Sequence, residues 1–155
     1  MTKIEYIDPF LESVELVLMQ FGVENIQKGQ LRKKEDMQVD LEITSVIELI
    51  GELRGNICYS FSNNTAKKLV SKMMMGMPVE EMDEMAISAV AELTNMITGS
   101  AATMLSSKEI VFDITPPSII FGEALSIGIS PLEILAVDIQ TQDGKIEVNI
   151  GLEKN

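Results

Sequence analysis

The sequence predicts one α/β domain of the α+β type, with a mostly antiparallel sheet and helices packed on one face. Three observations lead to this class. Apolar residues recur at helical spacing near the N-terminus and again over a long central segment. Between and after these segments, apolar and polar residues alternate in short runs, as in half-buried strands. No linker or low-complexity stretch divides this order of helix, strands, helices and strands, so a single domain over 1–155 is expected.

The first helix is expected over about 9–21, where apolar residues recur at helical spacing. Asp8 is suited to accept hydrogen bonds from the first free N–H groups of that helix. Pro9 suits the first helical position, where no backbone donor is needed. Gly22 follows as a natural stop.

Three strands are expected between this helix and the middle of the chain. Residues 37–44 alternate between apolar and polar side chains. Two further runs follow over 46–53 and 56–61, with Arg54-Gly55 as the turn between them. Cys58 lies in the last run and is interpreted as a small sheet residue, because a thiol nucleophile would need a base that the sequence does not provide.

Two helices are expected next. The cap Asn63-Asn64-Thr65 begins a short helix that runs to about Met75 and ends at Gly76. Pro78 then introduces a long amphipathic helix over about 80–106. The acidic residues of its first turn are favourable to the helix dipole and are interpreted in that way rather than as metal ligands: Glu80, Glu81, Asp83 and Glu84.

Strands are expected again toward the C-terminus. Asp143-Gly144 lies between two alternating runs, which is a specific signal for a β-hairpin. The expected strands cover 110–113, 119–121, 125–129, 134–140 and 146–152.

The charge of the chain limits its partners. Its 155 residues carry 24 acidic and 12 basic side chains, for a net charge of -12. Nucleic acids and anionic membranes are bound through lysine and arginine, so neither is expected as a partner. The one basic cluster, Arg32-Lys33-Lys34, is followed at once by Glu35-Asp36 and is interpreted as a solvated loop.

The residue inventory limits the chemistry. The chain has no histidine and one cysteine, which excludes a histidine-based triad, a histidine metal site and a thiolate zinc site. Catalysis must therefore use carboxylates, amides, hydroxyls or groups that a partner supplies. A cytoplasmic location is expected, because the N-terminus lacks the apolar stretch of a signal peptide and no apolar run approaches the roughly 18 residues that span a bilayer.

A polar stripe runs along the long helix. At about 100° per residue, Ser88, Glu92, Asn95 and Gly99 fall within an arc of roughly 60°. A wide apolar face covers the neighbouring side and is expected to pack on the core: Met82, Met85, Ala86, Ala89, Val90, Leu93, Met96 and Ile97.

This stripe has two interpretations. A glutamate and an asparagine on an exposed helix face are usually only solvated. However, asparagine is a poor helix former, and Gly99 costs about 1 kcal/mol relative to alanine in a helix interior. Both residues on one stripe favour a contact surface, where the small Gly99 lets another surface approach the backbone.

The stretch 83–101, DEMAISAVAELTNMITGSA, resembles the signature helix of the CheC/CheX/FliY phosphatases of bacterial chemotaxis. The hallmark of that family is an acidic residue or serine, three residues, glutamate, two residues and asparagine, here Ser88, Glu92 and Asn95. The preceding GNICYSFSNNTAKKLVSKMMMGM and the following DITPP resemble the CheX branch. The resemblance runs from about residue 46 to the C-terminus.

The resemblance implies a CheC-like fold with an internal pseudo-duplication. It also implies hydrolysis of the aspartyl phosphate of a CheY-like response-regulator receiver domain in two-component signalling. Glu92 and Asn95 would be the catalytic residues, with Asn95 holding the attacking water and Glu92 pairing with a lysine of the receiver. Ser88 and Gly99 would contact the partner. The receiver would hold the Mg²⁺, so no cofactor is expected on this chain.

The N-terminal helix lacks a second copy of the motif. It has Ser13, but Val17 and Gln20 stand where CheC-type members carry glutamate and asparagine. One active site per chain is therefore expected, as in the CheX branch, whose members form homodimers through their sheets. The alternative is a non-enzymatic CheX-like or FliM-like module that binds a receiver or a flagellar partner without hydrolysis.

Overall fold

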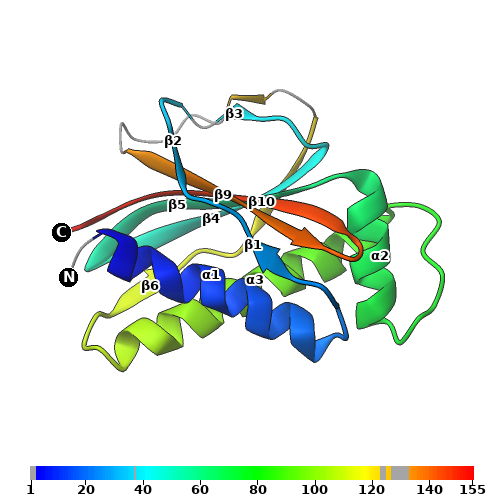
Figure 1. Cartoon of the computed structure of the whole chain (residues 1–155), viewed down its shortest axis with the longest axis horizontal. Helices are drawn as coiled ribbons and strands as arrows, with labels where there is room; N and C mark the ends of the chain where they lie inside the picture. Colours follow the sequence, from blue (N-terminus) through cyan, green and yellow to red (C-terminus); the bar gives the residue numbers. More distant parts are fainter. Residues whose placement is uncertain (1–2, 37, 123–124, 127–132) are drawn as a thin grey trace.

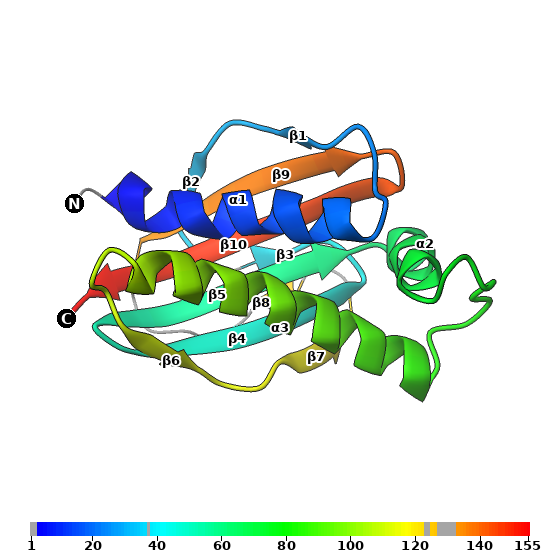
Figure 2. The same cartoon turned by 90° about the horizontal axis from the view of Figure 1, so that it is seen from below.

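The computed structural model describes residues 3–36, 38–122, 125–126 and 133–155, and it has two main layers (Figure 1). One layer is an antiparallel sheet with the strand order β1-β9-β10-β5-β4-β6, in which β2 also pairs with β9 and β7 with β4. The other layer is formed by α1 and α3, which lie side by side across one face of the sheet (Figure 2). The predicted fold class is confirmed.

Three helices and ten strands make up the described chain. The helices are α1 Lys3–Gln20, α2 Asn63–Met73 and α3 Glu84–Ser106. The strands are β1 Gln27–Lys28, β2 Arg32–Lys34, β3 Gln38–Val39, β4 Ile43–Gly51, β5 Leu53–Phe61, β6 Phe112–Ile114, β7 Ser118–Phe121, β8 Leu125–Ser126, β9 Ile134–Thr141 and β10 Gly144–Lys154. Two strand predictions, over 37–44 and 125–129, fall partly on positions outside the described residues. None of the described helices combines the length and hydropathy needed to cross a bilayer.

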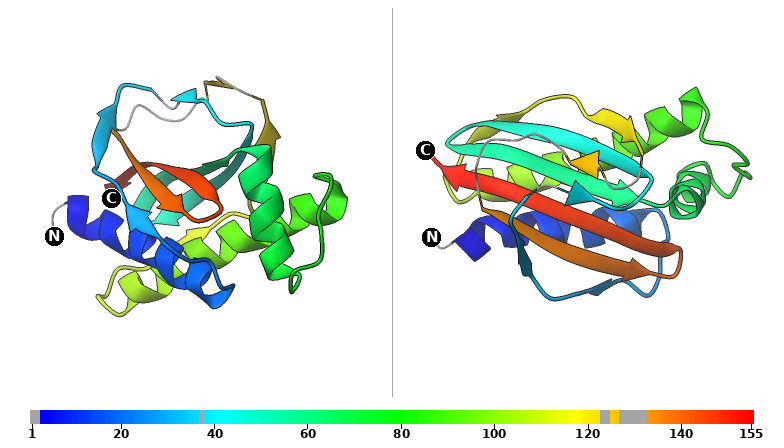
Figure 3. Two further views of the ribbon diagram at one scale, coloured as in Figure 1. Left: turned by 45° about the vertical axis from the view of Figure 1, so that its right-hand side comes forward. Right: turned by 90° about the horizontal axis from the view of Figure 1, so that it is seen from above.

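The core lies between the sheet and the two long helices. Alternate residues of β5 and β10 point into it, among them Ile57, Tyr59 and Val148, and they meet the apolar faces of α1 and α3. Helix α2 packs against the same cluster from one end of the sheet (Figures 1 and 2). The β2–β3 segment lies on the opposite face of the sheet (Figure 3).

Helix α1 begins earlier than predicted. Its first residue is Lys3, and Pro9 lies inside the helix rather than at its start. An interior proline removes one helical hydrogen bond and costs about 3 kcal/mol. Tyr6 and Ile7 are buried in the core, so packing of this extra turn offsets that cost. Asp8 is therefore an exposed helical residue and not a cap.

The turn between β4 and β5 also lies at a different position from the one predicted. The structure puts it at Glu52, and the predicted turn residue Gly55 lies within β5, opposite Leu49 of β4. Gly55 has a φ of +142°, and a Cβ there would collide with the carbonyl oxygen of Gly151 on β10. This glycine is required by the close approach of a neighbouring strand, not by a turn.

The basic cluster forms a strand, not a solvated loop. β2 pairs with β9, and the Nζ of Lys34 donates to Glu147 Oε1 at 3.0 Å and to Asn149 Oδ1 at 2.9 Å. Arg32 donates to Glu147 Oε2 at 3.1 Å. Burial alone would raise the pKa of Glu147, but hydrogen bonds from Asn149 and Lys34 and the two positive charges lower it below its ordinary value. A buried carboxylate such as Glu147 needs partners of this kind, which explains why the basic cluster is held in β2 beside it.

Cys58 is a sheet residue in β5, as predicted, and it is buried on the same face of the sheet as Glu147. Burial raises the pKa of its thiol to about 12, with a smaller opposing effect from the charge of Lys34. A thiol with such a pKa is almost fully protonated near neutral pH, so Cys58 is not poised as a nucleophile.

The helix boundaries around α2 and α3 follow their caps. Ser62 caps α2 by accepting a hydrogen bond from the N–H of Thr65 at 3.1 Å. At the other end, Met75 adopts a left-handed conformation with a φ of 59°, and the N–H of Gly76 donates to the carbonyl of Ser71 at 2.8 Å. This arrangement is a Schellman motif in which methionine takes the position that usually holds glycine. For a residue other than glycine, the left-handed conformation costs about 1 to 2 kcal/mol of stability.

Helix α3 begins at Glu84, four residues later than predicted. Asp83 caps it, accepting a hydrogen bond from the N–H of Ala86 at 2.9 Å. Glu80 and Glu81 therefore lie in the loop between α2 and α3 rather than in the first helical turn.

Candidate active site

Helix α3 presents one face to the core and the opposite face to solvent. Its buried residues include four of the predicted apolar face, namely Ala86, Val90, Leu93 and Ile97. Met85 was expected on that face but is 58% exposed. Thr94 and Thr98 were not expected there and are fully buried.

The two buried threonines hold α3 against the sheet. The hydroxyls of Thr94 and Ser45 lie 2.7 Å apart, and those of Thr98 and Tyr59 lie 2.8 Å apart. Ser45 is on β4 and Tyr59 is on β5. Burial raises the pKa of Tyr59, and its hydrogen bond with Thr98 offsets only part of this effect. Because each pair satisfies two hydroxyls that are out of contact with water, the rotation of α3 about its axis is fixed.

This rotation turns the predicted stripe outward. Ser88 and Glu92 are exposed, and Asn95 and Gly99 are partly exposed. Ser88, Glu92 and Asn95 line one groove of about 390 Å³. Gly99 belongs to the same face of the helix but does not line the groove, and a Cβ added there would meet no atom within 4 Å.

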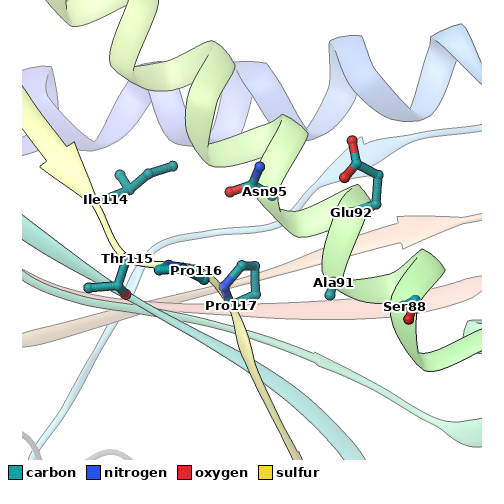
Figure 4. A pocket seen from close by; sticks show the side chains of 8 residues that line it. All are labelled: Ser88, Ala91, Glu92, Asn95, Ile114, Thr115, Pro116 and Pro117. Carbon is teal, nitrogen blue, oxygen red and sulfur yellow. The ribbon is translucent and has the colours of Figure 1, made fainter. Parts of the chain in front are cut away.

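The second wall of the groove comes from the segment that joins β6 to β7. Ile114, Thr115, Pro116 and Pro117 face α3 across the groove (Figure 4). The backbone N–H of Thr115 donates to the carbonyl of Glu48 at 3.0 Å, and the N–H of Glu48 donates to the Thr115 hydroxyl at 3.0 Å. These two bonds hold the wall on β4, and the two prolines restrict its backbone.

Sequence reasoning gave this wall no place in the site. Residues 115–117 contribute to the family resemblance only as part of the flanking motif DITPP. Two successive prolines after a short strand are a signal for a rigid segment, but the signal does not say what that segment faces. The pairing of β6 and β7 with β4 brings this segment next to Asn95.

The groove is lined by one carboxylate, one carboxamide and two residues with hydroxyl groups, Ser88 and Thr115. Glu92 points away from the proline wall, whereas Asn95 lies at the middle of the groove (Figure 4). A carboxamide can donate and accept hydrogen bonds but does not act as a base near neutral pH. In the part of the chain that the structure describes, no three acidic or cysteine side chains gather closely enough to hold a metal ion. The groove therefore suits positioning and polar recognition.

The corresponding positions of α1 are not presented in the same way. Ser13 is fully buried, with its hydroxyl 3.7 Å from the sulfur of Met104 on α3, and Val17 is 3% exposed. Two of the three positions that would carry a second motif, Ser13 and Val17, are thus turned toward α3 and the core, whereas Gln20 is exposed.

Comparison with known proteins identifies the family. The family model of the chemotaxis phosphatase CheX matches residues 43–139, which is more than half of the chain. The chain belongs to the CheX family. The matched region contains both walls of the groove and leaves out α1.

Individual relatives agree with the CheX assignment. The CheY-P phosphatase CheX of Thermotoga maritima is 41% identical over 91 residues, which span 59% of this chain and 59% of that relative. A crystal structure of the CheX–CheY–BeF3–Mg²⁺ complex from Borrelia burgdorferi has a TM-score of 0.79 at 35% identity, covering 96% of this chain and 98% of that one. A CheC-like superfamily protein from Shewanella sp. PV-4 has a TM-score of 0.87 at 27% identity, covering 98% and 99%.

Proposed function

We propose that this protein hydrolyses the aspartyl phosphate of a CheY-like receiver domain in chemotaxis signalling. The observation that carries the proposal is that Glu92 and Asn95 line the groove of α3 together, within the region that matches the CheX family. Relatives named CheY-P phosphatase and found in complex with CheY support the same substrate class.

The reaction needs little covalent chemistry from this chain. Water attacks the phosphorus, the bond from phosphorus to the aspartate oxygen breaks, and the products are aspartate and inorganic phosphate. Such a transfer depends on positioning and on stabilisation of charge. Asn95 would hold the attacking water in line by hydrogen bonding, because its amide can donate and accept. The fixed rotation of α3 keeps that amide at the groove.

Glu92 would pair with a lysine of the receiver and fix the register between the two proteins. Ser88 and Gly99 would contact the receiver on either side of this pair. The residues of the groove include a single carboxylate, which is a poor donor set for Mg²⁺. We therefore propose that the receiver holds the Mg²⁺, which neutralises charge on the phosphoryl oxygens when bound.

A homodimer and a cytoplasmic location also belong to the proposal. The homodimer rests on the resemblance to the CheX branch. Light scattering on the purified chain tests it, and a mass of one chain across the micromolar range would contradict it. The cytoplasmic location rests on the sequence and on the receiver as substrate.

The activity is tested with a CheY receiver phosphorylated by acetyl phosphate. We expect catalytic amounts of this protein to accelerate the release of inorganic phosphate above the rate of the receiver alone. Binding of the phosphorylated receiver without acceleration, over the receivers of the source organism, would instead support the non-enzymatic module.

A further inference from the structure

An exposed apolar surface lies next to the groove, at the N-terminal end of α3. Met85 is 58% exposed, and it precedes Ser88 by three residues on the same helix face. In the loop before α3, Met77 is 60% exposed and Met75 is 97% exposed. These three side chains are among the most exposed large apolar residues of the described chain. Methionine at such positions is typical of adaptable binding surfaces.

A pocket of about 310 Å³ forms part of this surface. Its apolar lining includes Met74, Val79 and Met85, which come from both sides of the loop. Its rim is acidic, with Glu80, Glu81 and Asp83. The Asp83 carboxylate is already engaged as the helix cap, so Glu80 and Glu81 are the charges available to a partner.

Met75 adds a second kind of observation. Its left-handed backbone favours glycine, and its side chain is almost fully exposed. A side chain that is unfavourable to the backbone and makes little contact within the protein is explained by contact with a partner.

We propose that this surface, which we call the methionine ledge (residues 74–81 and Met85), docks the same receiver that reacts at Asn95. The inference rests on the proposed function, because it takes the same partner. Met85 and Asn95 are ten residues apart in one helix, or about 15 Å along its axis. A standard interface covers about 800 Å² on each partner, roughly 30 Å across. A receiver centred on Asn95 therefore reaches Met85, at the edge of the ledge.

The ledge also specifies the chemistry of the receiver surface. The apolar lining fits an apolar side chain, and the acidic rim is complementary to a neighbouring lysine or arginine. The ledge is separate from the groove that holds the phosphoryl group, so it contributes to affinity and to the choice of receiver. It leaves the rate of the chemical step unchanged.

The test measures phosphate release from phosphorylated CheY at increasing concentrations of this protein. Met85→Ala keeps a good helix former at an exposed site. Met75→Gly places glycine where the backbone is left-handed, which removes the strain of a side chain there. Both variants should therefore fold as the wild type does. We expect each to raise the half-saturating concentration by about five- to tenfold with an unchanged maximal rate. Ile4→Ala is the matched control, because Ile4 is 51% exposed in the first turn of α1, at the end of the molecule away from α2 (Figure 2).

The acidic rim is tested with the double variant Glu80→Gln and Glu81→Gln. We expect a raised half-saturating concentration whose increase shrinks at high salt. The double variant Glu35→Gln and Asp36→Asn removes the same charge from the segment on the opposite face of the sheet and should behave as the wild type (Figure 3).

Two outcomes would overturn the inference while leaving the proposed function intact. If Met85→Ala and Met75→Gly have the same half-saturating concentration as the wild type, the ledge does not dock the receiver. A lowered maximal rate at an unchanged half-saturating concentration would place Met85 in the chemical step.

If the wild type accelerates no release, the proposed function fails, and the affinity for phosphorylated CheY is then compared by fluorescence anisotropy. Equal affinities of wild type and Met85→Ala would overturn the docking as well.

Discussion

The hydroxyl groups of Ser45 and Thr94 lie 2.7 Å apart in the core, and they couple the central sheet to α3. Thr94 directly precedes Asn95 in the chain. The contact that anchors the helix is therefore one residue from the amide that we propose to hold the attacking water. The geometry of the groove depends on this buried pair as much as on the exposed residues.

Replacing Thr94 with valine tests this coupling. The variant keeps the branched shape but leaves the buried Ser45 hydroxyl without this partner, which costs about 1 to 3 kcal/mol. Ser45→Ala combined with Thr94→Val should be less destabilising than the sum of the single variants, because no unpaired hydroxyl remains. Urea unfolding measures the four free energies, and additive effects would contradict the coupling.

Asn95→Ala should lower the rate of phosphate release by about 100-fold or more, since loss of a positioning group has effects of this order. Alanine favours helix at this partly exposed position, so the thermal midpoint should not fall. Single-turnover release from phosphorylated CheY measures the rate. Ser88→Ala is the matched control on the same stripe, and we expect a small effect. Retained turnover in Asn95→Ala would remove the water-positioning role.

Glu92→Gln should weaken docking and turnover together, because it removes the charge that we propose to pair with a receiver lysine while keeping the shape of the side chain. The half-saturating concentration should rise about tenfold, and the difference from wild type should shrink as salt is added. An effect that is independent of salt would argue against an ion pair.

Gly99→Ala separates stability from docking. The added methyl group meets nothing within 4 Å, and alanine is favoured over glycine in a helix interior by about 1 kcal/mol. The thermal midpoint should therefore rise by about 2 to 4 °C. If the receiver approaches the helix backbone closely at this position, affinity for it should fall in the same variant. A more stable variant with wild-type affinity would exclude Gly99 from the interface.

Glu147 makes the stability depend on acid pH. Its folded-state pKa is lowered from 4.5, so its stabilising contribution is complete above that pH and is lost as the pH falls through the folded value. Glu147→Gln should cost about 2 kcal/mol at pH 7, where the Lys34 ion pair is intact. The difference from wild type should shrink below about pH 4.5 in urea unfolding. A constant difference would exclude this linkage.

The polar stripe could be predicted from the sequence because helical periodicity is a local property. Residues three and four apart share a helix face wherever that helix lies, so Ser88, Glu92 and Asn95 had to be neighbours. The same reasoning predicted the hairpin at 143–144 and the place of Cys58 in a strand, because both follow from local alternation and turn chemistry. The absence of histidine limited any catalysis to carboxylates, amides, hydroxyls or groups of a partner, and the family resemblance indicated which partner.

What faces the stripe was decided only by the tertiary structure. The wall from Ile114 to Pro117 lies beside Asn95 because β6 pairs with β4, more than sixty positions away in the chain. The exposure of Met85 depends on where α3 is capped and how it rotates, and that rotation depends on partners from β4 and β5. Tertiary packing likewise explains why Pro9 lies in a helix interior and why Gly55 lies in a strand. Long-range packing can outweigh the local preference of a residue, and it alone determines which groups meet across a groove.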